Sequence, residues 1–184
     1  MTYLVGGTPR AGKTALKKLL LGKYGIPGFC TDYLRDALGH EAPKFGIKKG
    51  MSDIEKSEIL WPFFKGILNQ RIKYYKDDLL VEGTNFLPRY LSEYKEKNDI
   101  KMVFLGYADL DPEEKLKQIR NNPGAEGEWT SDMSDSELRD LVDEFIKISK
   151  YYESECAKYG IKYFDTSKNF EDVIKQAADY LTGK

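Results

Sequence analysis

The sequence is poor in cysteine and histidine, and it contains no long uninterrupted apolar run. Its two cysteines, Cys30 and Cys156, lie far apart and fit no metal-ligand spacing, so we expect free thiols rather than a disulfide framework or a zinc site. His40 is the only histidine, which gives no basis for a histidine metal site or a catalytic triad. No segment reaches membrane-spanning length or has the form of a signal peptide. We therefore expect a cytoplasmic protein without a membrane partner.

An excess of charge of one sign is also missing. Lysine plus arginine number 29 and aspartate plus glutamate number 30, giving a formal net charge of -1. Such a chain has no global basic field that would attract nucleic acid, so we expect no nucleic-acid partner. No linker-like composition divides the 184 residues, and a single domain over residues 1–184 is expected. Both a monomer and a homodimer remain open.

The clearest motif in the sequence follows its first apolar segment. Residues 6–14 read Gly-Gly-Thr-Pro-Arg-Ala-Gly-Lys-Thr and fit the P-loop pattern G-x-x-x-x-G-K-[ST], with a strand expected before the loop and a helix after it. Backbone N–H groups and the helix N-terminus would bind phosphate, Lys13 would add a positive charge, and Thr14 would bind magnesium. The expected phosphate-binding residues are Gly7, Thr8, Pro9, Arg10, Ala11, Gly12, Lys13 and Thr14.

Segments of strand type and helix type alternate along the rest of the chain. The expected strands cover about residues 3–5, 29–31, 79–83, 101–107 and 161–164. This alternation predicts an α/β structure, a three-layer P-loop NTPase fold with a five-stranded parallel sheet. Ligands bind such sheets at the carboxyl ends of the strands. Asp32, Glu82 and Asp165 each stand at such an end.

Several helices are indicated by capping signals and apolar spacing. A helix starting at Asp32 would place Arg35 on the same face. A capping box at residues 52–55 predicts a helix through about Trp61, with Pro62 beginning or kinking the next one. Residues 39–50 are expected to form a loop. The helically spaced residues expected in the core after Pro62 are Phe64, Ile67, Leu68, Ile72 and Tyr75.

Two segments would complete a ligand site around the sheet. Residues 33–76 predict a helical region that binds the second substrate. Residues 120–134 lie between well-capped helices and include a polar, glycine-bearing stretch, which is typical of a short lid.

Three segments together resemble the P-loop kinases of the adenylate-kinase-like superfamily. They are residues 6–14, Thr-Asp-Tyr-Leu-Arg at 31–35, and Leu-Val-Glu-Gly-Thr-Asn at 80–85. The nearest likeness is to 2-phosphoglycerate kinase, shikimate kinase and zeta-toxin-like ATP-binding proteins. This resemblance implies an ATP-dependent phosphotransferase that uses Mg²⁺ and transfers the γ-phosphoryl group to a hydroxyl or phosphate of a small metabolite, which we expect to be anionic.

The resemblance also implies a role for each candidate residue. Lys13 would hold the β- and γ-phosphates, and Asp32 would bind the acceptor hydroxyl and take its proton. Arg35 would bind the acceptor, and Arg120 would pack on adenine or reach the transferred phosphate. Glu82 would hold magnesium through water or serve the acceptor site. Further expected contacts are Thr84 and Asn85 with the acceptor, and Asp165, Thr166 and Ser167 with the base.

Structural roles are open for the same residues. Asp32 could be a helix cap, Arg35 could form a surface ion pair, and Glu82 could simply leave the sheet for solvent. Residues 165–167 could be a helix-capping loop, and residues 84–85 could form a turn.

The alternative functions are a nucleotide or nucleoside kinase, a non-catalytic nucleotide-binding switch, and a toxin-like kinase of a nucleotide sugar. Nucleotide kinases tend to have more arginines around the acceptor than region 33–76, where Arg71 is the only arginine besides Arg35. The Asn-Lys-x-Asp motif for guanine is missing, which disfavours a GTP-dependent switch. A preference of a kinase for ATP or GTP is not decided by the sequence.

Overall fold

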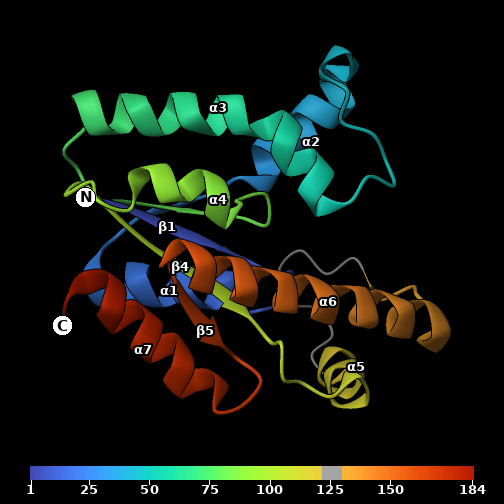
Figure 1. Cartoon of the computed structure of the whole chain (residues 1–184). Helices are drawn as coiled ribbons and strands as arrows, with labels where there is room; N and C mark the ends of the chain where they lie inside the picture. Colours follow the sequence, from blue (N-terminus) through green and yellow to red (C-terminus); the bar gives the residue numbers. More distant parts are fainter. Residues whose placement is uncertain (122–129) are drawn as a thin grey trace.

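A five-stranded, all-parallel sheet forms the centre of the structure, a computed structural model that describes residues 1–121 and 130–184 (Figure 1). The strand order is β2-β3-β1-β4-β5. The strands are β1 (Thr2–Gly7), β2 (Gly28–Cys30), β3 (Leu79–Glu82), β4 (Ile100–Gly106) and β5 (Lys162–Asp165). The predicted α/β fold with a five-stranded parallel sheet is confirmed.

Helices cover both faces of this sheet. The α-helices are α1 (Lys13–Tyr24), α2 (Asp32–Glu41), α3 (Asp53–Tyr74), α4 (Pro88–Leu91), α5 (Pro112–Arg120), α6 (Asp135–Tyr159) and α7 (Phe170–Thr182), and short 3-10 turns are η1 (Pro43–Phe45) and η2 (Ser92–Tyr94). Helices α3 and α4 lie on one side of the sheet, and α1 and α7 lie on the other (Figure 1). None of these helices is both long and apolar enough to span a membrane, as far as the described residues go.

The side chains of the strands point alternately to the two faces of the sheet and form one hydrophobic core on each face. In β1, the side chains of Tyr3 and Val5 pack with α1 and α7, whereas Leu4 points to the opposite core with α3 and α4. Successive strand residues face opposite sides of a sheet, so strands buried on both faces are apolar throughout. Helix α6 joins the two cores, because Val142 packs in the first and Tyr152 in the second.

Helix starts match their sequence signals closely. The Ser52 hydroxyl accepts a hydrogen bond from the backbone N–H of Glu55, and Ser134 does the same for Glu137 at the start of α6. The side chain of each glutamate in turn accepts a hydrogen bond from the backbone N–H of the capping serine, which completes the predicted capping boxes.

Helix α3 differs from the prediction in its length and its end. It runs without interruption through Pro62, although a proline inside a helix costs about 3 kcal/mol. Buried side chains on both sides of the proline, including Trp61 and Phe64, anchor the helix and offset that cost. Tyr75, expected in the core, is 56% exposed, because the helix ends at Tyr74 and the backbone becomes extended there. The expected loop over 39–50 also starts late, since α2 continues to Glu41.

Candidate functional site

The P-loop connects the carboxyl end of β1 to the start of α1. Gly7 and Gly12 have φ angles of 126° and 102°, in the left-handed region that favours glycine. A Cβ atom on Gly7 would lie 1.9 Å from the backbone oxygen of Leu105 in the neighbouring strand. Close packing against β4 and the backbone conformation therefore both require glycine at this position.

We expect Gly7→Ala to lower the free energy of unfolding by about 2–4 kcal/mol, because the loop must move away from Leu105. Urea unfolding measures this change. Gly66→Ala is the matched control, since Gly66 lies within α3 with open space around it and alanine favours a helix interior by about 0.5–1 kcal/mol. A Gly7→Ala protein as stable as wild type would contradict the described close approach.

Lys13 directs its ammonium group to the backbone at the start of the loop. Its Nζ donates hydrogen bonds to the carbonyl oxygens of Gly7 at 3.0 Å and Thr8 at 2.7 Å. Burial lowers the pKa of Lys13, while the carboxylates of Glu82 and Asp32 oppose this shift. A buried cation held by backbone carbonyls is ready to exchange these partners for phosphate oxygens.

A buried hydrogen-bond network holds Thr8 and Pro9 of the P-loop in place. The hydroxyls of Thr8 and Ser149 lie 2.8 Å apart, and the backbone N–H of Tyr107 donates to Ser149 Oγ at 3.1 Å. The Tyr107 hydroxyl donates to the carbonyl of Pro9 at 2.9 Å, and burial raises the pKa of this tyrosine well above its usual value. Helix α6 and the exit of β4 thus both position the loop, which no sequence motif had indicated.

Lys115 on α5 adds a second buried lysine beside the loop. Its Nζ donates to the carbonyl of Arg10 at 3.0 Å and lies 3.9 Å from the ring centroid of Tyr107. Burial, followed by the positive charges of Arg10 and Lys13, lowers the pKa of Lys115 to about 8. These three cations lie close enough at the P-loop to repel one another, which favours a polyanionic ligand there. Lys115 was missed because nothing in the sequence relates α5 to the loop.

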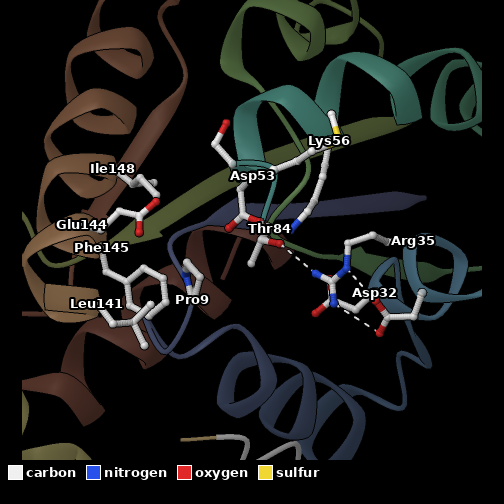
Figure 2. A pocket seen from close by; sticks show the side chains of 13 residues that line it. Pro9, Asp32, Arg35, Asp53, Lys56, Thr84, Leu141, Glu144, Phe145 and Ile148 are labelled. Atoms are coloured by element: carbon white, nitrogen blue, oxygen red, sulfur yellow. Dashed lines mark hydrogen bonds and ion pairs between the residues drawn. The ribbon is translucent and has the colours of Figure 1, made fainter. Parts of the chain in front are cut away.

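A cavity of about 360 Å³ lies beside the P-loop, between α2, the start of α3, and α6 (Figure 2). Pro9 brings the loop itself to the cavity wall. The loop and the cavity are therefore neighbouring parts of one site, of a size that suits a small molecule.

Helix α2 contributes the predicted pair of Asp32 and Arg35 to this cavity. Arg35 Nη1 donates to Asp32 Oδ1 at 2.9 Å and to Thr84 Oγ1 at 3.4 Å, and its Nε donates to Asp36 Oδ1 at 2.8 Å. Asp32 does not cap the helix, because Thr31 occupies the cap position. The carboxylate of Asp32 instead holds Arg35 at the cavity wall.

Asp53 and Lys56 reach the cavity from the first turn of α3, and sequence reasoning missed both. The Lys56 Nζ lies 3.9 Å from Asp53 Oδ1. Burial raises the pKa of Asp53, while the charges of Lys56 and Arg35 oppose the shift. The capping box located the start of this helix, but only the packing of α3 shows which residues of its first turn face the cavity.

The residues at the end of β3 and just after it have different surroundings. Glu82 is buried and forms an ion pair with Lys17 at 3.0 Å, so it does not leave the sheet for solvent. Thr84 lines the cavity, and its backbone oxygen accepts a bond from Tyr152 at 2.9 Å. Asn85 lies behind the wall, where its amide donates to the carbonyl of Asp53 at 3.3 Å.

The loop after β5 is tied to the end of β4. Asp165 accepts hydrogen bonds from the N–H groups of Ala108 at 2.8 Å and Ser167 at 2.7 Å. The Thr166 hydroxyl donates to the carbonyl of Gly106 at 2.9 Å. The N-cap residue of α7 is Asn169. Residues 165–167 therefore do not cap that helix but connect the carboxyl ends of β4 and β5.

The expected lid at 120–134 falls mainly on residues 122–129, which lie outside the described residues. At its start, Arg120 donates to Asp135 at 2.9 Å and to the carbonyl of Met133 at 2.6 Å. At its end, Thr130 is buried and accepts a bond from Arg10 at 3.0 Å. Thr130 therefore ties this segment to the P-loop, whereas Arg120 is held by the start of α6.

Comparison with solved structures finds a similar overall fold in two kinases and in one uncharacterized protein. One similar structure is shikimate kinase from Bacteroides thetaiotaomicron, with a TM-score of 0.58 and 15% identity; the alignment covers 99% of this chain and 98% of that one. Another is a gluconokinase from Sinorhizobium meliloti 1021, with a TM-score of 0.60 and 15% identity; the alignment covers 99% of this chain and 91% of that one. An uncharacterized protein from Eubacterium ventriosum ATCC 27560 aligns at a TM-score of 0.57 and 12% identity over 100% and 99%. No protein-family model and no curated protein sequence matches the chain. The chain has the adenylate-kinase-like fold of P-loop kinases.

Proposed function

We propose that this chain is an ATP-dependent phosphotransferase that moves the γ-phosphoryl group to a hydroxyl of a small molecule. The observation that carries the proposal is the cavity beside Pro9, which has Asp32 and Asp53 in its wall. A hydroxyl bound there would lie next to the loop that would hold the triphosphate. Positioning and charge neutralisation are the main contributions that a protein makes to phosphoryl transfer.

On the donor side, the P-loop would bind the phosphates through its backbone N–H groups, and Lys13 would neutralise the β- and γ-phosphates. Thr14 is half-buried in the first turn of α1, where its hydroxyl could bind a magnesium ion that neutralises charge on the same phosphates. Glu82 would reach that ion only through water, because Lys17 already holds its carboxylate. Arg120 and residues 165–167 remain candidates for contacts with the nucleotide.

Magnesium fits the chemistry of these oxygen donors. The described part of the chain contains no group of three or more histidine, cysteine, aspartate or glutamate side chains that could hold a metal. Mg²⁺ usually keeps several waters and is bound by a few protein oxygens together with substrate phosphates. Thr14 and Glu82 match that mode of binding.

On the acceptor side, Asp32 would accept the proton of the attacking hydroxyl. Arg35 holds one oxygen of its carboxylate, which fixes the orientation of the side chain. Thr84 would donate or accept a hydrogen bond at the same wall, while Asn85 would support the start of α3. A carboxylate that is fixed near the acceptor can act as a general base.

A nucleotide acceptor is less well supported by the charges of the region. Arg71, the other arginine of the helical segment, pairs with Asp77 at 3.1 Å and lies near Thr2, at the amino end of β1. Arg71 therefore lies near the amino ends of the strands, whereas the P-loop follows the carboxyl end of β1. This leaves Arg35 and Lys56 as the cations of the cavity wall.

A coupled assay for ADP release tests the proposed function. The panel includes shikimate, gluconate, neutral sugars, amino sugars, nucleosides and nucleotides, and mass spectrometry identifies the phosphorylated product. We expect at least one acceptor to raise ADP release about tenfold or more above the rate without acceptor. Binding of ATP with no acceptor-dependent transfer would instead favour a nucleotide-binding switch.

Lys115 gives the proposed donor site a pH dependence. With its pKa lowered to about 8, Lys115 is charged below that pH and becomes neutral above it, so the attraction for triphosphate declines as the pH rises from 7 to 9. We expect ATP affinity measured by calorimetry to fall about tenfold over that range, with proton uptake on binding near pH 9. Lys115→Met should weaken binding at pH 7 by a similar factor and remove most of the dependence. An unchanged pH profile in this variant would exclude Lys115 from the donor site.

A further inference from the structure

Carboxylates outnumber cations in the wall of the cavity. Among the described residues, Asp32, Asp36, Asp53 and Glu144 line it together with two cationic side chains, Arg35 and Lys56. A cavity wall with more negative than positive charges repels anions and favours cations. The expected anionic acceptor is therefore not the one that the side chains suit best.

Both cations are already engaged by these carboxylates. Arg35 lies between Asp32 and Asp36, with donor–acceptor distances of 2.9 Å and 2.8 Å, and uses a further N–H toward Thr84. Lys56 faces Asp53 at 3.9 Å. An anionic acceptor would have to displace a carboxylate from Arg35, leaving that carboxylate without its cation, or share Lys56 with Asp53. Uncompensated charge in a partly buried site is costly.

Glu144 lies across the cavity from this charged wall, on α6 (Figure 2). No lysine, arginine or histidine of the described residues forms an ion pair with its carboxylate. Its neighbours on the same face of the helix are Leu141, Phe145 and Ile148, which make this side of the cavity apolar. Glu144 is an exposed carboxylate at the rim of this apolar side, which suits a ligand that carries an amine beside a hydrocarbon part.

We propose that the acceptor is a small amino alcohol or amino sugar, with a protonated amine bound by Glu144 and its hydroxyl directed toward Asp32. This inference rests on the proposed phosphotransferase function and specifies its substrate class. The acceptor oxygen forms a new bond to the γ-phosphorus, the bond from that phosphorus to the bridging oxygen of ADP breaks, and the hydroxyl proton passes to Asp32. The acceptor amine keeps its proton throughout.

Two matched sets of probes test the charge preference at pH 7. The first set is glucosamine, glucose and gluconate, and the second is phenylalaninol, phenylpropanol and phenyllactate. Each set offers an amine, a neutral compound and a carboxylate on a related skeleton. Calorimetry with a non-hydrolysable ATP analogue measures binding, and ADP release measures transfer. We expect the amine to bind about tenfold more tightly than the neutral compound in at least one set, as for a hydrogen bond between charged groups.

Glu144→Gln should remove most of that preference, because the amide keeps the shape of the side chain and loses its charge. Glu153→Gln is the matched control, an exposed glutamate of the same helix outside the cavity wall, and it should keep the preference. Equal binding of the three compounds, tighter binding of the carboxylates, or an unchanged preference in Glu144→Gln would each overturn the inference.

The same measurements separate this inference from the proposed function. Lys13-dependent transfer to a neutral or anionic acceptor, without preference for an amine, would keep the phosphotransferase and refute the amine site. Selective amine binding without transfer to any acceptor would keep the amine site and refute the phosphotransferase.

Discussion

Lys13→Ala is expected to lower kcat/KM for phosphoryl transfer by about 10³-fold or more, because it removes the lysine cation of the P-loop. In the structure, the Nζ of Lys13 is held by the carbonyls of Gly7 and Thr8, at the place where β- and γ-phosphates would bind. The loss should concern both ATP affinity and turnover. ADP release with the best acceptor of the panel measures the change.

The fold of this variant should remain intact, since Lys13 forms no ion pair within residues 1–121 and 130–184 and its Nζ is held by two backbone carbonyls. Circular dichroism and thermal unfolding check this point. Lys18→Ala provides the control, because it removes an exposed lysine from the same helix. Transfer by Lys13→Ala within about tenfold of wild type would exclude this loop from the mechanism.

Asp32→Asn is expected to reduce kcat for transfer by about 10²–10³-fold and to change the affinity for ATP by less than about threefold. The amide has the size of the carboxylate but cannot take up the proton of the acceptor hydroxyl. ATP would be bound by the loop and not by α2, so its dissociation constant should hardly change. Single-turnover transfer and calorimetry with ATP measure these quantities separately.

Asp36→Asn distinguishes proton transfer from the positioning of Arg35. Both aspartates hold the same guanidinium group, but only Asp32 is assigned to the acceptor hydroxyl. If Asp36→Asn slowed transfer as much as Asp32→Asn, the effect would belong to Arg35. If Asp53→Asn caused the larger loss and Asp32→Asn little, the proton acceptor would be Asp53.

The parts of the site that the sequence predicted are contiguous or one helical turn apart. The P-loop is a single segment whose glycines, lysine and threonine have fixed spacing, and the pairing of Asp32 with Arg35 follows from helix geometry. The strand ends at Glu82 and Asp165 followed from the alternation of strands and helices. For the P-loop and for the Asp32–Arg35 pair the distance along the chain decides the distance in space, whereas the common edge of Glu82 and Asp165 follows from the parallel sheet.

The parts that were missed depend on how distant helices are rotated against the sheet. Asp53, Lys115, Glu144 and Ser149 lie on three different helices, and each helix has several polar residues that could equally have faced solvent. Packing of apolar side chains decides which of them turns inward. Packing also explains the continuous helix through Pro62, because local propensity alone predicts an interruption there.

The position of helices α2 and α3 between two neighbouring strands has a consequence for evolution and engineering. The chain leaves the sheet after β2 and returns as β3, which pairs directly with β2. Residues 31–78 are thus a single crossover connection between two neighbouring parallel strands, from the carboxyl end of β2 to the amino end of β3, while the P-loop belongs to other segments. If the proposed function holds, a different crossover could replace this one and change the accepted substrate without altering the proposed ATP site. The replacement would need to preserve the apolar face of Leu60, Phe64 and Leu68 that packs on the sheet.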